Sequence, residues 1–400
     1  MATSFLIQPV SATCSPYWSS SAAVYGASAL AVGWTLSGPP SVLIRKAGLQ
    51  LFAVVCLICC TSALLFAGTC VSFCIGDTSG AWQVLFIGSF TLFGFGADLA
   101  MRTMGEMLVH WFPRRSGLSG GVFDMGISVG SIVFGLVLLG FSQLVDSERL
   151  GANTMLFLTG FIVFTLMVLW IPFLEYPHGD VFPKLLSYQQ DTYGRLISQL
   201  ATKQMLIISF GFFANVFTGT AVFSSLARIL SALWKSKDPP LMLLTLAVFG
   251  SCTIGRLTCL CLGDFIGLKR AWWISLTSQA LVLFVLPWLM EGGPVWTQSA
   301  AIVTLCMYMF GYPAVKTLEV GLTYQIMGNK IGCTACGVLS VIAGPAGLLG
   351  PIAIEQTYSA FGTYKPFFIG TAVILLLASL STACLHSLET TSNARSSGKK

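Results

Sequence analysis

Eleven apolar stretches, each of twenty residues or more, follow one another along the chain. A helix rises about 1.5 Å per residue, so each stretch is long enough to cross the hydrocarbon core of a bilayer. A backbone in lipid must satisfy its own hydrogen bonds, which makes these stretches helices. The sequence predicts an all-α membrane protein with about eleven transmembrane helices, at residues 20–42, 49–71, 82–109, 117–145, 153–174, 205–230, 241–263, 271–290, 295–322, 333–354 and 366–385.

Composition excludes most other classes of protein. The chain is 55% hydrophobic and only 9% charged, whereas soluble domains are usually about 25% charged. Most of the thirteen cysteines lie inside apolar stretches, and the three histidines are scattered, so we predict neither a metal site nor a cofactor. No nucleophile–base pair or phosphate-binding loop stands out, and an enzyme is not predicted. We also expect no nucleic-acid partner.

The basic residues predict the topology. If the polar segment 175–204 is cytoplasmic, thirteen Lys and Arg lie on that side and four on the other. The positive-inside rule then places the C-terminus in the cytoplasm and the N-terminus outside. The predicted segments are a polar N-terminus (1–19), a five-span bundle (20–174), a cytoplasmic central loop (175–204), a six-span bundle (205–385) and a cytoplasmic tail (386–400). We recognise no targeting address, so the sequence does not distinguish the plasma membrane from an organelle membrane.

One charged turn carries a family resemblance. Asp264, Gly267, Lys269 and Arg270 lie between two apolar stretches, and their spacing resembles the Asp-x-x-Gly-x-Lys/Arg-Arg signature of the major facilitator superfamily. The pair Gly255-Arg256 is placed as in its monocarboxylate and oxalate:formate antiporter branches. The resemblance implies a two-bundle helical transporter that alternates access to a central cavity.

The first half carries a weaker copy of this turn, from Gly38 to Gly48. Arg45 stands where the family has an acid, and Ser41 where it has a glycine. The copy follows the first predicted span, whereas the family's turn follows the second span of each half. We therefore expect the first of the usual twelve helices to be absent, either because the sequence is short at its start or because the chain is a derived member.

Two further stretches resemble these branches. Residues 109–121 are similar to the Trp-Phe-Pro junction of the oxalate:formate branch, with Ser116 at a position where arginine is usual. Residues 350–368 resemble the junction before the last span of monocarboxylate transporters, with Glu355 and Ser359 in place of glycine and aspartate.

One short segment resembles a different branch. Gly121-Val122-Phe123-Asp124 is similar to a segment in LAT-type facilitators of neutral amino acids within the same superfamily. Since solutes of both branches carry a carboxylate, the class of substrate is better supported than either branch.

Eight ionisable residues lie inside predicted spans. Each costs about 2.5–3.5 kcal/mol at a helix centre, so these side chains should face a polar cavity, one another or a helix end. Asp98, Arg102 and Glu106 recur every four residues and share one helix face. They could carry a proton or gate the cytoplasmic side, or form a structural ladder of charges. Arg228 lies near a span end, from which its side chain can reach the interface.

Arg256 is the predicted substrate anchor. No acid lies within helical reach on its own span, and its planar fork suits two-point contact with a carboxylate. The monocarboxylate resemblance implies this role, although that branch has an aspartate where this chain has Cys252. A salt bridge to Asp98 or Asp124 is the alternative. On the ninth span, Lys316 and Glu319 can neutralise each other, and Tyr312 can form part of a pocket wall.

The sequence thus predicts a transporter of a small carboxylate-bearing solute such as pyruvate or lactate, with a proton as an optional partner. The predicted substrate-binding residues are Arg256, Lys316 and Tyr312. The predicted proton-coupling or gating residues are Asp98, Arg102, Glu106, Asp124, Glu319, Asp264 and Arg270. A neutral amino-acid facilitator is one alternative. A sensor or membrane scaffold that has lost transport is the other, motivated by the absent first helix.

Overall fold

A computed structural model describes six long ranges of the chain, residues 48–73, 81–111, 152–174, 202–233, 241–291 and 295–397, and single positions between 29 and 36 and between 125 and 137. Every regular element in the six ranges is a helix. The elements are α4 (Leu49–Phe73), α5 (Ala81–Trp111), α7 (Ala152–Trp170), the 3₁₀ turn η2 (Ile171–Phe173), α10 (Lys203–Ser224), α11 (Leu226–Leu233), α12 (Leu241–Ile266), α13 (Leu268–Met290), α14 (Val295–Phe361) and α15 (Lys365–Ser397).

Nine segments of the described residues are long and apolar enough to cross a membrane. They coincide with nine of the eleven predicted spans. The other two predicted spans, residues 20–42 and 117–145, lie mostly outside the described residues, as does the polar segment between α7 and α10. The prediction of an all-helical, multi-pass membrane protein is confirmed.

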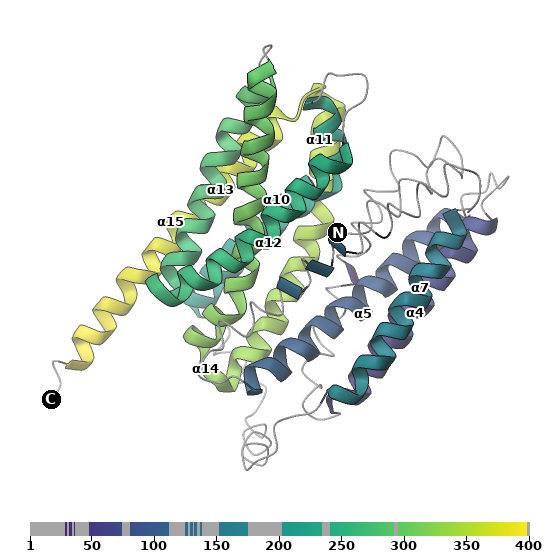
Figure 1. Ribbon diagram of the computed structural model, residues 1–400. Coiled ribbons are helices and arrows are strands. Elements are labelled where there is room, and N and C mark those ends of the chain that lie inside the picture. The colour runs from purple at the N-terminus through teal and green to yellow at the C-terminus, as the bar shows by residue number, and fades with distance from the viewer. Residues whose placement is uncertain are drawn as a thin grey trace.

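α14 contains two of these spans. Its 67 residues would measure about 100 Å if straight, far more than a bilayer core. Instead the helix turns back on itself near its middle (Figure 1), between the spans Trp296–Met327 and Ala335–Phe361. At the turn, Gly332 lies so close to the ring of Tyr324 that a Cβ there would be 2.6 Å from Cδ1.

The predicted span 205–230 is broken at Ser225. α10 ends at Ser224, and α11 begins at Leu226. At the break, the hydroxyl of Ser224 bonds the carbonyl oxygen of Ala221 at 2.9 Å, and Ser225 has a non-helical ψ of 5°. The backbone bonds on either side are kept, since Ser225 N donates to Ala221 O and Ile229 N donates to Ser225 O.

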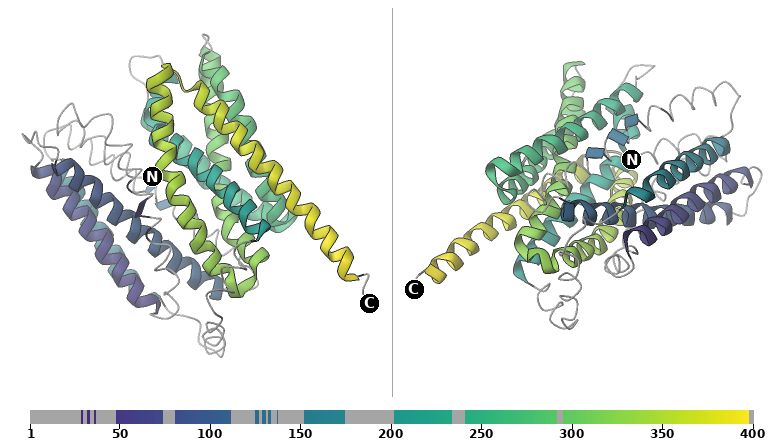
Figure 2. Two further views of the ribbon diagram at one scale, coloured as in Figure 1. Left: turned by 180° about the vertical axis from the view of Figure 1, so that it is seen from behind. Right: turned by 60° about the horizontal axis from the view of Figure 1, so that its bottom comes forward.

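The described helices form two groups (Figures 1 and 2). In the first group, α4 packs against α5 and α7. In the second, α14 packs against α10, α12 and α13, and α15 packs against α13 and α10. The end of α15 extends beyond its group in all three views. Among the described residues, the second group holds an extensive buried apolar core, built around α14.

Two glycines support the prediction that residues 38–48 are a copy of the charged turn at residues 264–270. Gly267, in the charged turn, has φ +89°, and Gly48, its counterpart in the first-half copy, has φ +92°. Each stands immediately before a helix. The carbonyl oxygen of Gly267 accepts a bond from Ala271 N at 3.1 Å, and that of Gly48 accepts one from Phe52 N at 3.4 Å. Only glycine adopts such a φ at little cost, so both halves use the same device to start the next helix.

An ion pair at one end of the second group joins α11 to α14. Arg228 Nη1 lies 2.5 Å from Glu355 Oε2. At the same end, Lys365 contacts Glu291 at 2.9 Å and stacks over the ring of Trp288. Arg228 is thus paired with Glu355, which occupies the position where the monocarboxylate motif has glycine, and its reach to the membrane interface stays a prediction.

We expect Glu355→Gln and Arg228→Met each to lower the melting temperature slightly, by the equivalent of about 0.5–1 kcal/mol, because both side chains are about one third exposed and such pairs contribute little. The double variant should cost less than the two single variants added together. Thermal melting of the purified variants in detergent measures this. Strictly additive losses would show that the pair contributes no coupling.

Candidate substrate-binding site

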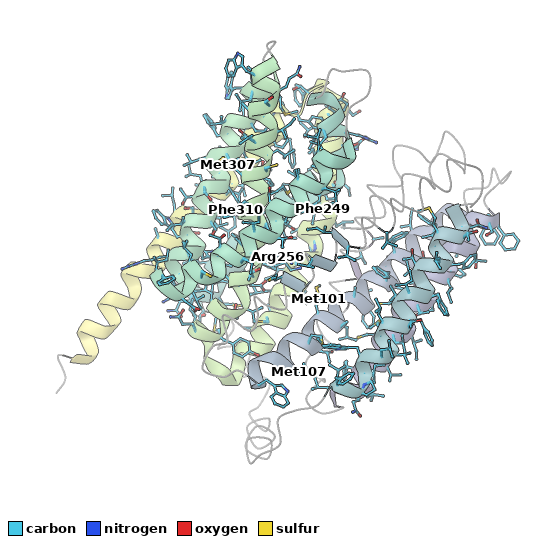
Figure 3. All side chains as sticks on the ribbon, viewed as in Figure 1. Met101, Met107, Phe249, Arg256, Met307 and Phe310 are labelled. Carbon is cyan, nitrogen blue, oxygen red and sulfur yellow. The ribbon has the colours of Figure 1, made fainter. Side chains whose placement is uncertain are left out.

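Arg256 is buried inside the second group, with 4% of its surface exposed. It lies in α12, one turn after Cys252, and its charge acts on the thiol of Cys252 and on the hydroxyl of Tyr312 in α14. In Figure 3, Arg256 and Met101 of α5 lie on sides of the two groups that are turned toward each other. The structure thus brings two of the predicted binding residues, Arg256 and Tyr312, together.

The neighbouring glycine explains how Arg256 comes so close to α14. A Cβ on Gly255 would lie 1.9 Å from the carbonyl oxygen of Phe310. The backbones of α12 and α14 therefore touch at this point, as small residues allow between membrane helices. This gives the Gly255-Arg256 pair in the sequence a physical basis. The glycine lets the backbones of α12 and α14 touch, and Arg256 is the next residue after this contact.

Tyr312 stands at a proline-containing part of α14. Pro313 lacks an N–H and weakens the local helix. Gln279 of α13, 1% exposed, braces this region by donating from Nε2 to the carbonyl oxygen of Gly311 at 3.1 Å. It also bonds the carbonyl oxygen of Ser275 on its own helix. The position of Tyr312 is therefore fixed by a side-chain amide from a neighbouring helix.

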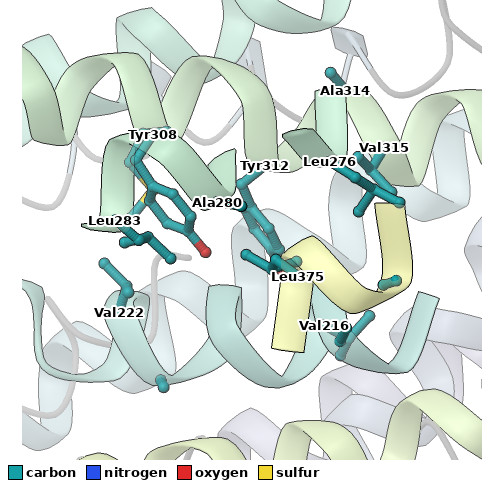
Figure 4. Close-up of a cluster of buried hydrophobic side chains, with 14 of the residues drawn as sticks. Val216, Val222, Leu276, Ala280, Leu283, Tyr308, Tyr312, Ala314, Val315 and Leu375 are labelled. Carbon is teal, nitrogen blue, oxygen red and sulfur yellow. The ribbon is translucent and has the colours of Figure 1, made fainter. Parts of the chain in front are cut away.

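Four aromatic rings form a connected cluster around Tyr312. Tyr308 lies one turn away on α14 with ring centroids 6.3 Å apart, and Phe223 of α10 is 5.4 Å from Tyr312. Phe223 in turn stacks on Phe249 of α12 at 5.9 Å. Figure 4 shows Tyr308 and Tyr312 projecting from α14 in the direction of α10. This aromatic cluster gives Tyr312 apolar surroundings between α10, α12 and α14.

Lys316 and Glu319 continue the face of α14 that bears Tyr312. The three positions are spaced i, i+4 and i+7, which places them on one side of a helix. Glu319 is buried, at 6% exposure, and Lys316 is half-buried. A polar stripe therefore runs along α14 from Tyr312. Whether Lys316 and Glu319 neutralise each other stays a prediction.

Asp98 belongs to the first group. It is 6% exposed on α5, and its charge acts on the thiol of Cys56 in α4. α5 approaches α4 closely beside it, because a Cβ on Gly96 would lie 2.8 Å from Cys60 Sγ. Arg102 and Glu106 also lie on α5, but their side chains and the whole of Asp124 fall outside the described part of the structure.

Asp264 and Arg270 occupy the charged turn. Both are exposed, at the end of α12 and the start of α13. Gly267 separates the two helices. Asp264 lies eight residues from Arg256, about 12 Å along the helix, so the turn is not part of the site around Arg256. A role for it in gating stays a prediction.

Sequence reasoning missed the residues that support this site. Gln279, Asn215 and Gly219 do not contribute a charge, and the resemblance to known families did not include them. The available signal was the presence of amides inside apolar stretches, where an unbonded polar group is costly. Asn215 bonds the main chain of Tyr312, and Gly219 lies against its ring.

Comparison with known proteins places the fold. No protein-family model matches the sequence, and no curated protein matches it. Solved structures do. A variant of the E. coli fucose:proton symporter FucP aligns over 95% of this chain and 96% of its own, with a TM-score of 0.66 and 12% identity. A structure of FucP in an outward conformation, described as a major facilitator superfamily transporter, aligns over 96% of both chains, with a TM-score of 0.66 and 14% identity.

The chain has the major facilitator fold. The predicted fold class is thus confirmed over nearly the whole length of both chains. At this level of identity the likeness concerns the fold. It supports neither of the two branches that the sequence motifs resemble.

Proposed function

We propose that this protein is a secondary transporter of a small solute that carries a carboxylate, with a monocarboxylate such as pyruvate or lactate as the first candidate. The observation that carries the proposal is Arg256, a buried guanidinium in the second helix group, on the helix whose backbone touches α14 two residues before Tyr312. A planar guanidinium can bind both oxygens of a carboxylate, and the tyrosine hydroxyl can donate a third hydrogen bond.

The fold supplies the mechanism. In major facilitator proteins, two bundles rock about a binding site near the membrane midplane. Arg256 and Tyr312 would hold the solute on one bundle, with Lys316 further along the same face of α14. Asp98, buried on α5, would be the carboxyl of the other bundle that takes up a proton or pairs with Arg256 when the site is empty. Glu106, Arg102 and Asp124 are further candidates for this gating role, as are Glu319 and the turn residues Asp264 and Arg270.

Proton coupling is supported by the similar structures, one of which is described as a fucose:proton symporter. The proposal therefore includes proton symport. Transport without a proton is also compatible with the proposal, because a carboxylate can be exchanged for another carboxylate. We place the C-terminus in the cytoplasm on the distribution of basic residues alone.

The test is uptake by proteoliposomes containing the purified protein. Labelled pyruvate, lactate, a neutral amino acid and fucose are supplied with and without an inward proton gradient. We expect pyruvate or lactate to accumulate, faster with the gradient. Uptake of neutral amino acids without dependence on the gradient would instead favour the facilitator suggested by Phe123 and Asp124. Uptake of fucose alone would contradict the carboxylate proposal, and no uptake at all would favour a sensor or scaffold.

A further inference from the structure

α10 holds residue 312 of α14 at two points. Asn215 Nδ2 donates to the main-chain carbonyl oxygen of Tyr312 at 3.3 Å. One turn later, Gly219 lies directly under the ring: a Cβ there would be 1.8 Å from Tyr312 Cε2. Asn215 thus fixes the backbone of Tyr312, and Gly219 leaves room for its ring.

The same face of α10 makes a third contact. Asn215, Gly219 and Phe223 are four residues apart and therefore share one side of the helix. The ring of Phe223 lies against that of Tyr312. Three successive turns of α10 thus contact a single residue of α14. Asn215 is fully buried, and an amide in that position costs free energy unless it is bonded.

α12 contacts α14 at almost the same level. The backbones meet where Gly255 touches the carbonyl oxygen of Phe310, two residues before Tyr312, and Arg256 acts on the Tyr312 hydroxyl from that side. The ring is therefore packed closely against α10 on one side, while α12 touches the backbone of α14 two residues earlier. Any atom added to α10 at residue 219 must displace the ring or separate the helices.

We propose that Asn215 and Gly219 are positioning residues that hold Tyr312 in place on the part of α14 that α12 touches at Gly255, so that α10 sets the affinity of the site for its solute. This inference rests on the proposed function. Neither residue touches the solute. Both act through Tyr312.

The central variant is Gly219→Ala, with Gly211→Ala as its matched control. Gly211 lies two turns earlier on the same helix, and a Cβ there would meet Trp272 at an ordinary 3.4 Å. In the uptake assay, we expect Gly219→Ala to raise the KM for pyruvate at least tenfold while Vmax changes less than threefold. Gly211→Ala should match the wild type. An unchanged KM in Gly219→Ala would overturn the proposal.

Asn215→Leu removes the hydrogen bond with little change in volume. We expect it to raise the KM as well, by about threefold, since one neutral hydrogen bond contributes about 1 kcal/mol or less. Asn215→Asp tests the donor, because a carboxyl oxygen facing the carbonyl of Tyr312 cannot replace the amide N–H when ionised. A wild-type KM in both variants would rule out a positioning role for Asn215.

A double-mutant cycle separates positioning from general damage to α10. Alanine at position 312 leaves room for a Cβ at residue 219. We therefore expect Gly219→Ala to have no further effect on the KM in the Tyr312→Ala background. An equal effect in both backgrounds would mean that the substitution acts on the helix and not through Tyr312.

Melting temperatures of the same four proteins give a readout that needs no solute. Gly219→Ala should lower the midpoint in the wild-type background, and in the Tyr312→Ala background it should leave the midpoint unchanged or raise it, because alanine is the better helix former. If the wild-type protein took up none of the solutes, the proposed function would fail, and the melting cycle would still support or overturn the α10–Tyr312 arrangement. If the melting temperatures show coupling between residues 219 and 312 but the KM values do not, the packing of α10 on Tyr312 is supported and the effect on solute affinity is overturned.

Discussion

Arg256→Ala should abolish high-affinity uptake of carboxylates. Removing one partner of a buried, hydrogen-bonded charge pair typically costs about 2–5 kcal/mol, which corresponds to a loss of affinity of about thirtyfold to more than a thousandfold. The loss should appear mainly as a higher KM in the proteoliposome assay. Arg256→Lys should recover part of it, because lysine keeps the charge and loses the two-point fork.

Lys203→Ala is the control for this experiment. Lys203 is an exposed cation at the start of α10, so its removal changes the net charge equally without touching the site. The two variants should elute alike on size exclusion, which shows that Arg256→Ala is folded. Uptake by Arg256→Ala at wild-type affinity would show that Arg256 does not bind the solute.

Gly255→Ala should damage both stability and transport. The added methyl group would meet the backbone of Phe310 at 1.9 Å, and a backbone cannot rotate away as a side chain can. α12 and α14 must therefore separate, at a cost of about 1–3 kcal/mol typical of overpacking. Because Arg256 moves with α12, the KM should rise as well. Thermal melting and uptake kinetics measure the two effects.

Gly250→Ala provides the comparison on the same helix. Nothing lies within 4 Å of a Cβ at Gly250, so this variant should melt and transport like the wild type. Equal behaviour of the two alanine variants would show that the contact between α12 and α14 at Gly255 does not constrain the protein.

The fold was predictable because hydropathy alone locates membrane helices. Nine predicted spans coincide with spans of the structure, and the turn at Gly267 was recognised from its residue pattern. The break at Ser225 was not predicted, because residues 205–230 form one apolar stretch without a proline. The tight return of α14 near Gly332 was located only as a short gap between two apolar runs.

The site was predictable only in part. A charged residue in an apolar helix is conspicuous, so Arg256, Asp98, Lys316 and Glu319 could be named from the sequence. The partner of Arg228 could not. Arg228 and Glu355 are separated by 127 residues, and no local pattern pairs them.

The supporting residues of the site were harder still to find. Gly219 is one glycine among many in the chain, and its importance depends on the ring of Tyr312, which only the packing of α10 against α14 brings to it. Such contacts between distant helices require the tertiary structure.

The most direct test of the central claim is exchange of labelled pyruvate in proteoliposomes preloaded with unlabelled pyruvate, for the wild type and for Arg256→Ala. Exchange requires solute binding and the rocking of the bundles, and it does not require a proton gradient. At a pyruvate concentration near the wild-type KM, we expect rapid exchange in the wild type and almost none above protein-free liposomes in Arg256→Ala. Equal exchange by both proteins would contradict the claim that Arg256 binds the carboxylate of the transported solute.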